Sequence, residues 1–279
     1  MTMINDRITF IGGGNMAASL IGGLIGDGYD KRRIRVADPD DAKLQVLADR
    51  FGVQTTRANN DAVDHGDIVI LAVKPQVMGE VAAGLKPAVD PARHLVISIA
   101  AGLRTPVLTG WLGERVPVVR AMPNTPALVQ SGATALFANA NVSDAQRDAA
   151  ETIMRSVGLT LWLDDEDRMD MVTALSGCGP AYFFLVMECL ENAARRLGLP
   201  ADLARLLTLQ TAFGAAKLAL ESDEPSATLR ARVTSPGGAT EEAVKVLQQG
   251  DLQSLFDRAL EAARQRAKTL ADELGGQDG

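Results

Sequence analysis

The 279-residue chain contains little histidine, cysteine or aromatic side chain, and each shortage narrows the chemistry open to it. Cys178 and Cys189 are its only cysteines, too few for a disulfide framework or a metal knuckle. Its only histidines are His65 and His94, so we expect no metal site of nitrogen and sulfur ligands. Neither histidine lies in a recognisable nucleophile–base motif, so a Ser-His-Asp or Cys-His mechanism has little material to draw on.

Positive charge and long apolar runs are also scarce. The formal net charge is −7 and there is no long basic run, which argues against nucleic acid as a partner. No window supplies the roughly 18 uninterrupted apolar residues of a membrane span. Met1–Ile11 contains no charged leader followed by an apolar segment and a cleavage site. We therefore expect no nucleic-acid partner, no membrane partner and a cytoplasmic location.

The residues that are present suffice for two domains, since 47% of the chain is hydrophobic and its length exceeds that of one typical small domain. The first part alternates short apolar runs with helical stretches, which predicts a mostly parallel, doubly wound α/β sheet. Helical periodicity takes over after Leu163, so we place an α/β domain at residues 1–163 and an all-α domain at 164–279. The predicted strands are Ile8–Ile11, Ile34–Ala37, Ile68–Val73, Leu95–Ile99 and Val116–Ala121.

The second part predicts long helices with apolar side chains on more than one face. Between about 180 and 220 these faces exceed what one amphipathic stripe needs, which suggests burial on two sides and hence a helical dimer interface. The acidic run Asp164–Asp167 is typical of a helix N-terminus, and Gly275–Gly279 resembles a frayed tail. The predicted helices run from Tyr182 to a stop at Gly198, then over Ala201–Glu221, Thr240–Gln249 and Leu252–Leu274.

A glycine-rich turn follows the first predicted strand. Gly12–Ala17 has the spacing G-x-G-x-x-A, in which Gly12 permits a tight turn and Gly14 lets backbone N–H groups approach a dinucleotide pyrophosphate. Asp38 ends the second predicted strand, near where a carboxylate binds the ribose of NAD. The alternative interpretation is an empty turn at the glycines and a simple turn residue at Asp38, which precedes a proline.

Three further loops follow predicted strands, at Ala72–Pro75, Ser98–Gly102 and Met122–Pro126. Ligands of open α/β sheets collect beyond the carboxyl ends of the strands. These loops are therefore the next candidates to contact a cofactor or a substrate.

A second candidate site lies at Val233–Glu242, where a Pro-Gly-Gly turn leads into an apolar-periodic helix. Such a turn exposes successive N–H groups that can hold a small carboxylate, and Thr240 is the predicted N-cap. A plain capped helix is the alternative. The loop Ser176–Tyr182 is a second glycine-flexed helix start in the same part of the chain, and the pair favours a pocket lined by backbone.

Taken together, the motifs resemble those of the pyrroline-5-carboxylate reductase family, in order and over nearly the whole chain. They are Gly12–Ala17, Ala72–Pro75, Met122–Pro126, Ser176–Tyr182 and, most specifically, the T-S-P-G-G-x-T run in Val233–Thr240. The resemblance implies an N-terminal Rossmann domain and a C-terminal helical domain that forms a homodimer. It also implies that the substrate binds between the two domains, and it leaves room for a decamer assembled from dimers.

The resemblance carries site residues onto this sequence. The implied cofactor residues, for NADPH or NADH, are Gly12, Gly13, Gly14, Asn15, Met16, Asp38, Asn59, Ala72, Val73, Lys74, Pro75 and Ala100. The implied substrate residues are Glu166, Asp223, Ser235, Gly238, Ala239 and Thr240. Glu224 is an alternative to Asp223, and Cys178 stands where the family commonly has serine.

The implied reaction is hydride transfer from NAD(P)H to L-1-pyrroline-5-carboxylate, which gives L-proline. A protonated cyclic imine is already a strong electrophile, so alignment and exclusion of water suffice. Thr240 is the candidate to orient or protonate the ring nitrogen, and Lys74 is either a general acid or a positioning residue.

Two rival functions share the fold. A β-hydroxyacid dehydrogenase would need a K-x-x-x-N helix, and none of the lysines has asparagine four residues on. A non-catalytic nucleotide sensor would have lost the 235–240 loop. Cofactor preference stays open, because Asp38 favours NADH whereas Arg32, Arg33 and Arg35 could favour NADPH.

Overall fold

The computed structural model describes residues 5–275, so part of the predicted tail and the first four residues lie outside the described range. The chain forms two compact units. The first is built from the residues up to Cys178 together with the segment from Ala263, and the second is Gly179–Ala262. These bounds differ from the predicted domain boundary at residue 163. The assignment of cofactor binding to residues 1–163 and of substrate binding and dimerisation to residues 164–279 stays a prediction.

The first unit contains one eight-stranded sheet within residues 5–275, in the order β3-β2-β1-β4-β5-β6-β7-β8. Every strand pair is parallel except β6 with β7. The mostly parallel α/β sheet is therefore confirmed. The strands are β1 (Ile8–Ile11), β2 (Ile34–Ala37), β3 (Gln54–Thr56), β4 (Ile68–Leu71), β5 (Leu95–Ser98), β6 (Val118–Met122), β7 (Gly132–Ala138) and β8 (Gly158–Trp162).

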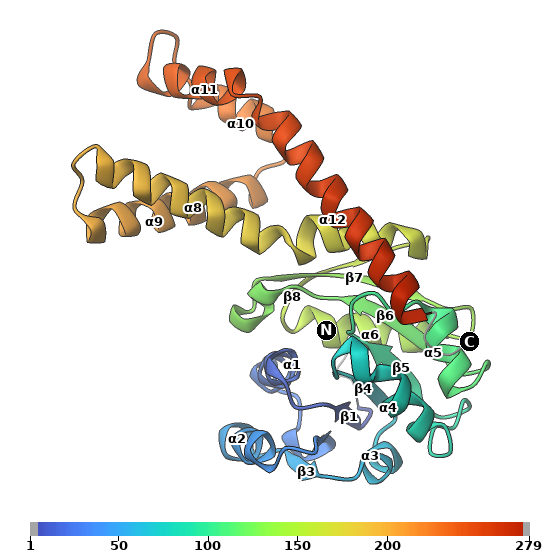
Figure 1. Ribbon diagram of the computed structural model, residues 1–279. Helices are drawn as coiled ribbons and strands as arrows, with labels where there is room; N and C mark the ends of the chain where they lie inside the picture. The colour runs from blue at the N-terminus through green and yellow to red at the C-terminus, as the bar shows by residue number, and fades with distance from the viewer. Residues whose placement is uncertain (1–4, 276–279) are drawn as a thin grey trace. The chain divides into compact units, whose positions relative to one another are not determined.

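Helices cover both faces of this sheet (Figure 1), so it is doubly wound. Fully buried strand residues such as Phe10 and Ile70 face one helical layer, and Ile11 and Val69 face the other. Both faces need an apolar cover, which explains the continuous apolar runs of the inner strands. The first layer holds α1 (Asn15–Gly26), α2 (Asp41–Phe51) and α6 (Asp144–Arg155), and the second holds α3 (Asn59–His65), α4 (Met78–Leu85) and α5 (Thr105–Leu112).

Short helical turns complete the first unit. The 3₁₀ turns are η1 (Lys31–Arg33), η2 (Pro75–Val77), η3 (Thr125–Val129) and η4 (Glu166–Arg168). The helix α7 (Met169–Val172) continues into the π-helical turn η5 (Thr173–Gly177).

The second unit is helical, as predicted. It contains α8 (Gly179–Arg196), α9 (Ala201–Leu220), α10 (Ser226–Arg232), α11 (Ala239–Gln249) and the first part of α12 (Leu252–Gly275). The helices α8 and α9 lie side by side (Figure 1), and Gly198, at a φ of +98°, lies in the turn between them. The predicted stop at Gly198 is therefore confirmed.

The last part of α12 belongs to the first unit. Ala267 and Ala271 are buried, and Leu274 packs with the cluster that fills the second helical layer. Gly102, at a φ of +80°, lies under this segment, where a Cβ would come within 3.3 Å of a Leu274 methyl group. The first unit thus combines chain segments from both ends of the described sequence.

Large apolar side chains are exposed along α8 and α9. Together these side chains form an apolar surface that the chain itself does not cover. They include Phe183, Phe184, Leu190, Leu206, Leu207 and Phe213. The helical run Glu166–Arg196 is long and apolar enough to cross a membrane. Its most apolar stretch has a mean hydropathy of 1.3, and 11% of that stretch is buried. A single helix of this length and composition is weak evidence for a membrane.

Candidate functional site

The glycine turn lies at the point where the strand order reverses. The chain leaves β1 for β2 on one side, whereas β4 lies on the other side of β1. Gly12 there has a φ of +102°, and a Cβ would lie 2.7 Å from the carbonyl oxygen of Ala72. Only glycine fits this position without displacing backbone. Open α/β sheets bind their ligands at this switch point.

Gly14 leaves a space that suits a pyrophosphate. It precedes α1 as the N-cap, and within residues 5–275 no side chain caps that helix start. A Cβ built on Gly14 would have no described heavy atom within 4 Å. The N–H groups that open α1 therefore lie next to open space at the positive end of the helix dipole, a cradle that favours an anion.

Asp38 ties this turn to the end of β2. Its carboxylate accepts hydrogen bonds from the backbone N–H of Gly13 at 2.8 Å and of Asp40 at 2.9 Å. The side chain is buried, and the Lys43 ammonium lies 3.6 Å from it. Asp38 is thus more than a turn residue before a proline, since it fixes the position of the glycine turn.

The other predicted cofactor residues lie near the same edge of the sheet. The Ala72 N–H bonds the carbonyl of Ile11 at 2.8 Å, which holds the loop after β4 against the end of β1. In this loop Val73 is half-buried, Lys74 is exposed and Pro75 opens η2. The rest follow the carboxyl ends of strands or open helices: Asn15 and Met16 in the first turn of α1, Asn59 at the start of α3, and the buried Ala100 just after β5.

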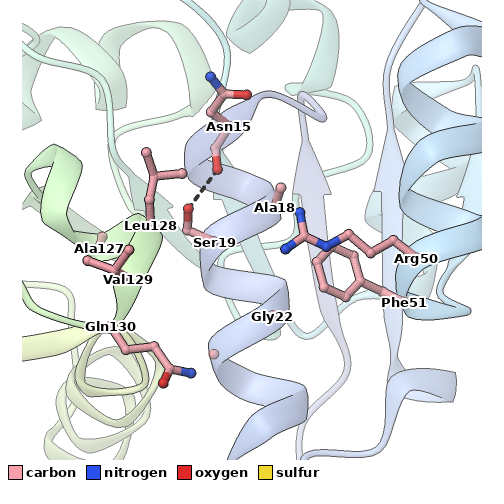
Figure 2. A pocket seen from close by; sticks show the side chains of 11 residues that line it. Asn15, Ala18, Ser19, Gly22, Arg50, Phe51, Ala127, Leu128, Val129 and Gln130 are labelled. Atoms are coloured by element: carbon pink, nitrogen blue, oxygen red, sulfur yellow. Dashed lines mark hydrogen bonds between the residues drawn. The ribbon is translucent and has the colours of Figure 1, made fainter.

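A cavity of about 410 Å³ lies beside α1 and shares only Asn15 with the predicted cofactor residues (Figure 2). Along α1, the Ser19 hydroxyl donates to the Asn15 carbonyl at 2.8 Å. Across the cavity, the Arg50 guanidinium lies over the Phe51 ring at 4.8 Å from the centroid. This cavity is therefore distinct from the cradle at Gly14.

Two loops that the sequence singled out contact each other in the first unit. The Asn124 side chain donates to the Ser176 carbonyl at 3.0 Å and accepts from the Ala133 N–H at 2.9 Å. A Cβ at Gly177 would come within 2.7 Å of the Met122 methyl group. The loop after β6 thereby holds the π-helical turn, a feature common at functional sites. Cys178 follows this turn and is half-buried.

Glu166 is held by three hydrogen bonds within the first unit. Its carboxylate accepts from the N–H and hydroxyl of Thr105, at 2.8 and 2.7 Å, and from Nη1 of Arg120 at 3.1 Å. These contacts brace the start of α5. A direct substrate contact of Glu166 stays a prediction, and the bonds seen here favour an indirect role.

Arg120 is the residue that sequence reasoning missed. It lies in the middle of β6 and is only 2% exposed, and its Nη2 is buried with no hydrogen-bond partner among the described residues. Its one sequence signal is a lone cation inside an apolar strand. A buried guanidinium needs its counter-ion, so Arg120 makes Glu166 structurally important.

The rest of the acidic run is more exposed. The predicted capping is confirmed at Asp165, whose side chain accepts from the Asp167 N–H at 2.9 Å at the start of η4. A hydrogen bond from Arg104 lowers the pKa of the Asp167 carboxyl. Within the part of the chain that the structure describes, no three His, Cys, Asp or Glu side chains gather as a metal site would require.

In the second unit, the loop before α11 is a tight turn. The Gly238 N–H bonds the Ser235 carbonyl at 3.0 Å, and Gly237 has a φ of +71°. Glu241 reaches back and accepts from the Gly237 N–H at 2.8 Å. Ala239 and Thr240 form the exposed start of the helix.

The predicted N-cap at Thr240 is wrong. The N-cap is Gly238, and Thr240 is the second helical residue. The Pro-Gly-Gly turn closes earlier than a Thr cap would require, because Glu241 bonds back into it. In the described structure no side chain caps α11, so its first N–H groups are left for an anion.

The alternative acidic residues of the second unit differ in their surroundings. Asp223 is exposed, whereas Glu224 is half-buried and its carboxylate accepts a hydrogen bond from Arg232. The ion pair leaves Asp223 as the freer of the two carboxylates.

Strand order, switch point and glycine turn together define the class of Rossmann-fold dinucleotide-binding proteins. Family models match two segments: NADP oxidoreductase, coenzyme F420-dependent, over residues 7–102, and pyrroline-5-carboxylate reductase dimerisation over residues 166–270. The curated pyrroline-5-carboxylate reductase of Pseudomonas aeruginosa is 50% identical over 98% of this chain and 100% of its own length. That of Pasteurella multocida is 44% identical over 94% of this chain and 97% of its own. The chain belongs to the pyrroline-5-carboxylate reductase family.

Solved structures agree with this assignment. A pyrroline-5-carboxylate reductase from Coxiella burnetii superposes with a TM-score of 0.93 at 49% identity, covering 96% of this chain and 99% of the other. The Plasmodium falciparum enzyme, with NADP bound, gives 0.84 at 31% identity over 96% and 99% of the two chains. The predicted family is confirmed, and the β-hydroxyacid dehydrogenase alternative is set aside.

Proposed function

We propose that this protein reduces L-1-pyrroline-5-carboxylate to L-proline with NAD(P)H, the last step of proline biosynthesis. The observation that carries the proposal is the exposed, uncapped start of α11 behind an intact 235–240 loop in a chain of this family. When bound, NAD(P)H would supply the hydride that reduces the C5 carbon of the imine. The protein's own task is to align the two reactants and exclude water.

The cofactor is held by the edge of the sheet at the switch point. The N–H groups that open α1 bind the pyrophosphate in the cradle at Gly14, and Asp38 keeps the glycine turn in place. The loop after β4 and Ala100 line the path toward the nicotinamide. The proposed residues are Gly12, Gly13, Gly14, Asn15, Met16, Asp38, Asn59, Ala72, Val73, Lys74, Pro75 and Ala100.

The substrate carboxylate binds the N-terminus of α11. The N–H groups there are uncapped, and Ser235, Gly238 and Ala239 shape the turn around them. The exposed hydroxyl of Thr240 can donate or accept a hydrogen bond, so it orients the ring nitrogen of the imine. Glu166 and Asp223 complete the proposed substrate side, Glu166 through the start of α5 that it braces.

The exposed apolar faces of α8 and α9 are the surface through which two copies form a homodimer. Their large side chains lie in the segment that matches the dimerisation family model. A second copy would remove that apolar area from water, which stabilises the dimer. Assembly of such dimers into a decamer, a cytoplasmic location and the absence of membrane and nucleic-acid partners complete the proposal.

Oxidation of NADH and NADPH, followed at 340 nm with purified protein, tests the function. Pyrroline-5-carboxylate is the substrate. The control is a 3-hydroxy acid assayed in the oxidative direction, in which NAD⁺ or NADP⁺ is reduced. Turnover of pyrroline-5-carboxylate alone is expected. Turnover of the hydroxy acid alone, or of neither compound while nucleotide binds, would refute the proposal.

A further inference from the structure

We propose that the carboxyl end of β2 selects NADH over NADPH, and that Asp40 is the residue that rejects the 2′-phosphate. The inference rests on the proposed function, since it concerns the cofactor of the same site. It settles the preference that the sequence left open between Asp38 and the neighbouring arginines.

Asp38 is built to receive a hydroxyl group. In dinucleotide-binding sheets the acidic residue at the end of the second strand accepts a hydrogen bond from the ribose 2′-hydroxyl. Here the Gly13 and Asp40 N–H groups fix the two carboxylate oxygens of Asp38, and each oxygen keeps a further lone pair. A 2′-phosphate has only acceptor oxygens to offer at neutral pH, so this buried carboxylate repels it.

The start of α2 is already filled by a carboxylate of the chain. An uncapped helix start beside the ribose would attract a phosphate group. Asp40 is the N-cap, and its Oδ1 accepts from the N–H of Ala42 at 2.9 Å and of Lys43 at 3.4 Å. The donors that a 2′-phosphate would use are therefore bound to a negative group of the protein.

The nearby cations are countered by carboxylates. The Lys43 ammonium lies 3.6 Å from Asp38 and 3.8 Å from Asp40, and the Arg57 guanidinium lies 3.5 Å from Asp41. Three carboxylates thus face two cations, and the cluster keeps a formal charge of −1. A second anion placed there would meet net repulsion.

Of the arginines that could have favoured NADPH, Arg32 and Arg33 precede β2, and Arg35 lies within it. Arg32 and Arg33 belong to η1, which precedes the strand, and at about 3.3 Å per residue they lie about 13 Å or more along the chain from its carboxyl end. Arg32 forms an ion pair with Asp30 at 2.8 Å, and Arg35 donates to the Gln54 amide oxygen at 2.6 Å. Asp30 thus neutralises the charge of Arg32, and Gln54 holds the Arg35 guanidinium toward β3.

Calorimetric titration of the full-length protein with NADH and with NADPH, at one ionic strength, tests the inference without relying on turnover. We expect NADH to bind at least about tenfold more tightly. In Asp40→Ser, which keeps a good N-cap residue but removes the charge, NADPH should bind more tightly and the ratio should narrow at least about threefold. Asp49→Ser makes the same charge change at an exposed site near the other end of α2 and should leave the ratio unchanged.

Wild-type protein that binds NADPH as tightly as NADH would overturn the inference. An unchanged ratio in Asp40→Ser, or an equal shift in Asp49→Ser, would overturn the assignment to Asp40. These failures differ from that of the proposed function. A protein that binds NADH tightly yet leaves pyrroline-5-carboxylate unreduced refutes the function alone, and one that reduces it with NADPH preferred refutes only the present inference.

Discussion

Replacing Glu166 with alanine tests the buried ion pair of the first unit. The Arg120 guanidinium is 2% exposed and has one buried nitrogen without a partner among the described residues. Glu166→Ala would leave that charge buried and uncompensated, and Thr105 would lose an acceptor for both its N–H and its hydroxyl. Removing one partner of a buried pair costs about 3–5 kcal/mol.

That loss converts to a clear thermal shift. A domain of this size loses about 2–4 °C in Tm per kcal/mol, so Glu166→Ala should unfold about 6–20 °C below wild type. Asp167→Ala is the matched control, because Asp167 is next to Glu166 in the sequence and also pairs with an arginine, Arg104, but its side chain is 74% exposed. Exposed ion pairs contribute little to stability, so the control should melt within about 4 °C of wild type.

Circular dichroism melts and urea titrations at one protein concentration give both quantities, since the stability of an oligomer depends on concentration. Glu166→Gln removes the charge but keeps an acceptor for Thr105. If the alanine variant does not fold, the melting temperature of Glu166→Gln measures the loss of the ion pair instead. Adding Arg120→Met to Glu166→Ala should restore part of the lost stability, because the stranded charge is then gone. Equal melting of Glu166→Ala and Asp167→Ala would refute the reasoning.

Further outcomes follow from other parts of the structure. Gly14→Val should raise the Kd for NADH at least about tenfold by filling the cradle, and wild-type calorimetric binding would contradict that site. Thr240→Ala should lower kcat with little change in the Kd for NADH; unchanged kinetics would remove its role. Phe213→Asp, on the exposed face of α9, should yield a monomer by light scattering, and an unaltered dimer mass would place the interface elsewhere. Burial lowers the pKa of His94, so its contribution to stability is complete above about pH 6.5 and declines as the pH falls below that value. His94→Asn, which keeps an acceptor for the Asp90 N–H, should lose less stability between pH 7 and 5.5 than wild type in urea titrations, and equal losses would exclude His94 as the cause.

Five strands could be predicted from their short, mostly apolar runs, and three could not. Gln54–Thr56 is short and polar, so it carries no apolar run. Gly158–Trp162 lies at the sheet edge with Leu159 and Leu161 exposed, and its pattern is too weak to separate from a loop. Gly132–Ala138 pairs antiparallel with β6. The alternation of strands and helices predicts only parallel strands, so it does not predict this one.

The site was predictable where glycine marks it and less so where side chains act over a distance. Gly12 has a positive φ, as the tight turn predicted from the motif requires. The partners of Glu166 lie far away in the sequence, at Thr105 and Arg120, so no local spacing reveals them. Thr240 was misplaced as a cap because the reach of Glu241 back to the turn depends on its side-chain conformation.

The return of α12 to the first unit has a consequence for how the protein can be made and cut. The stretch from Ala263 that packs over Gly102 is synthesised after all of Gly179–Ala262. The nucleotide-binding half therefore cannot reach its final form until this stretch has been translated. A gene fragment that stops at residue 178 would yield an α/β core that exposes the apolar surface on which Ala267, Ala271 and Leu274 pack.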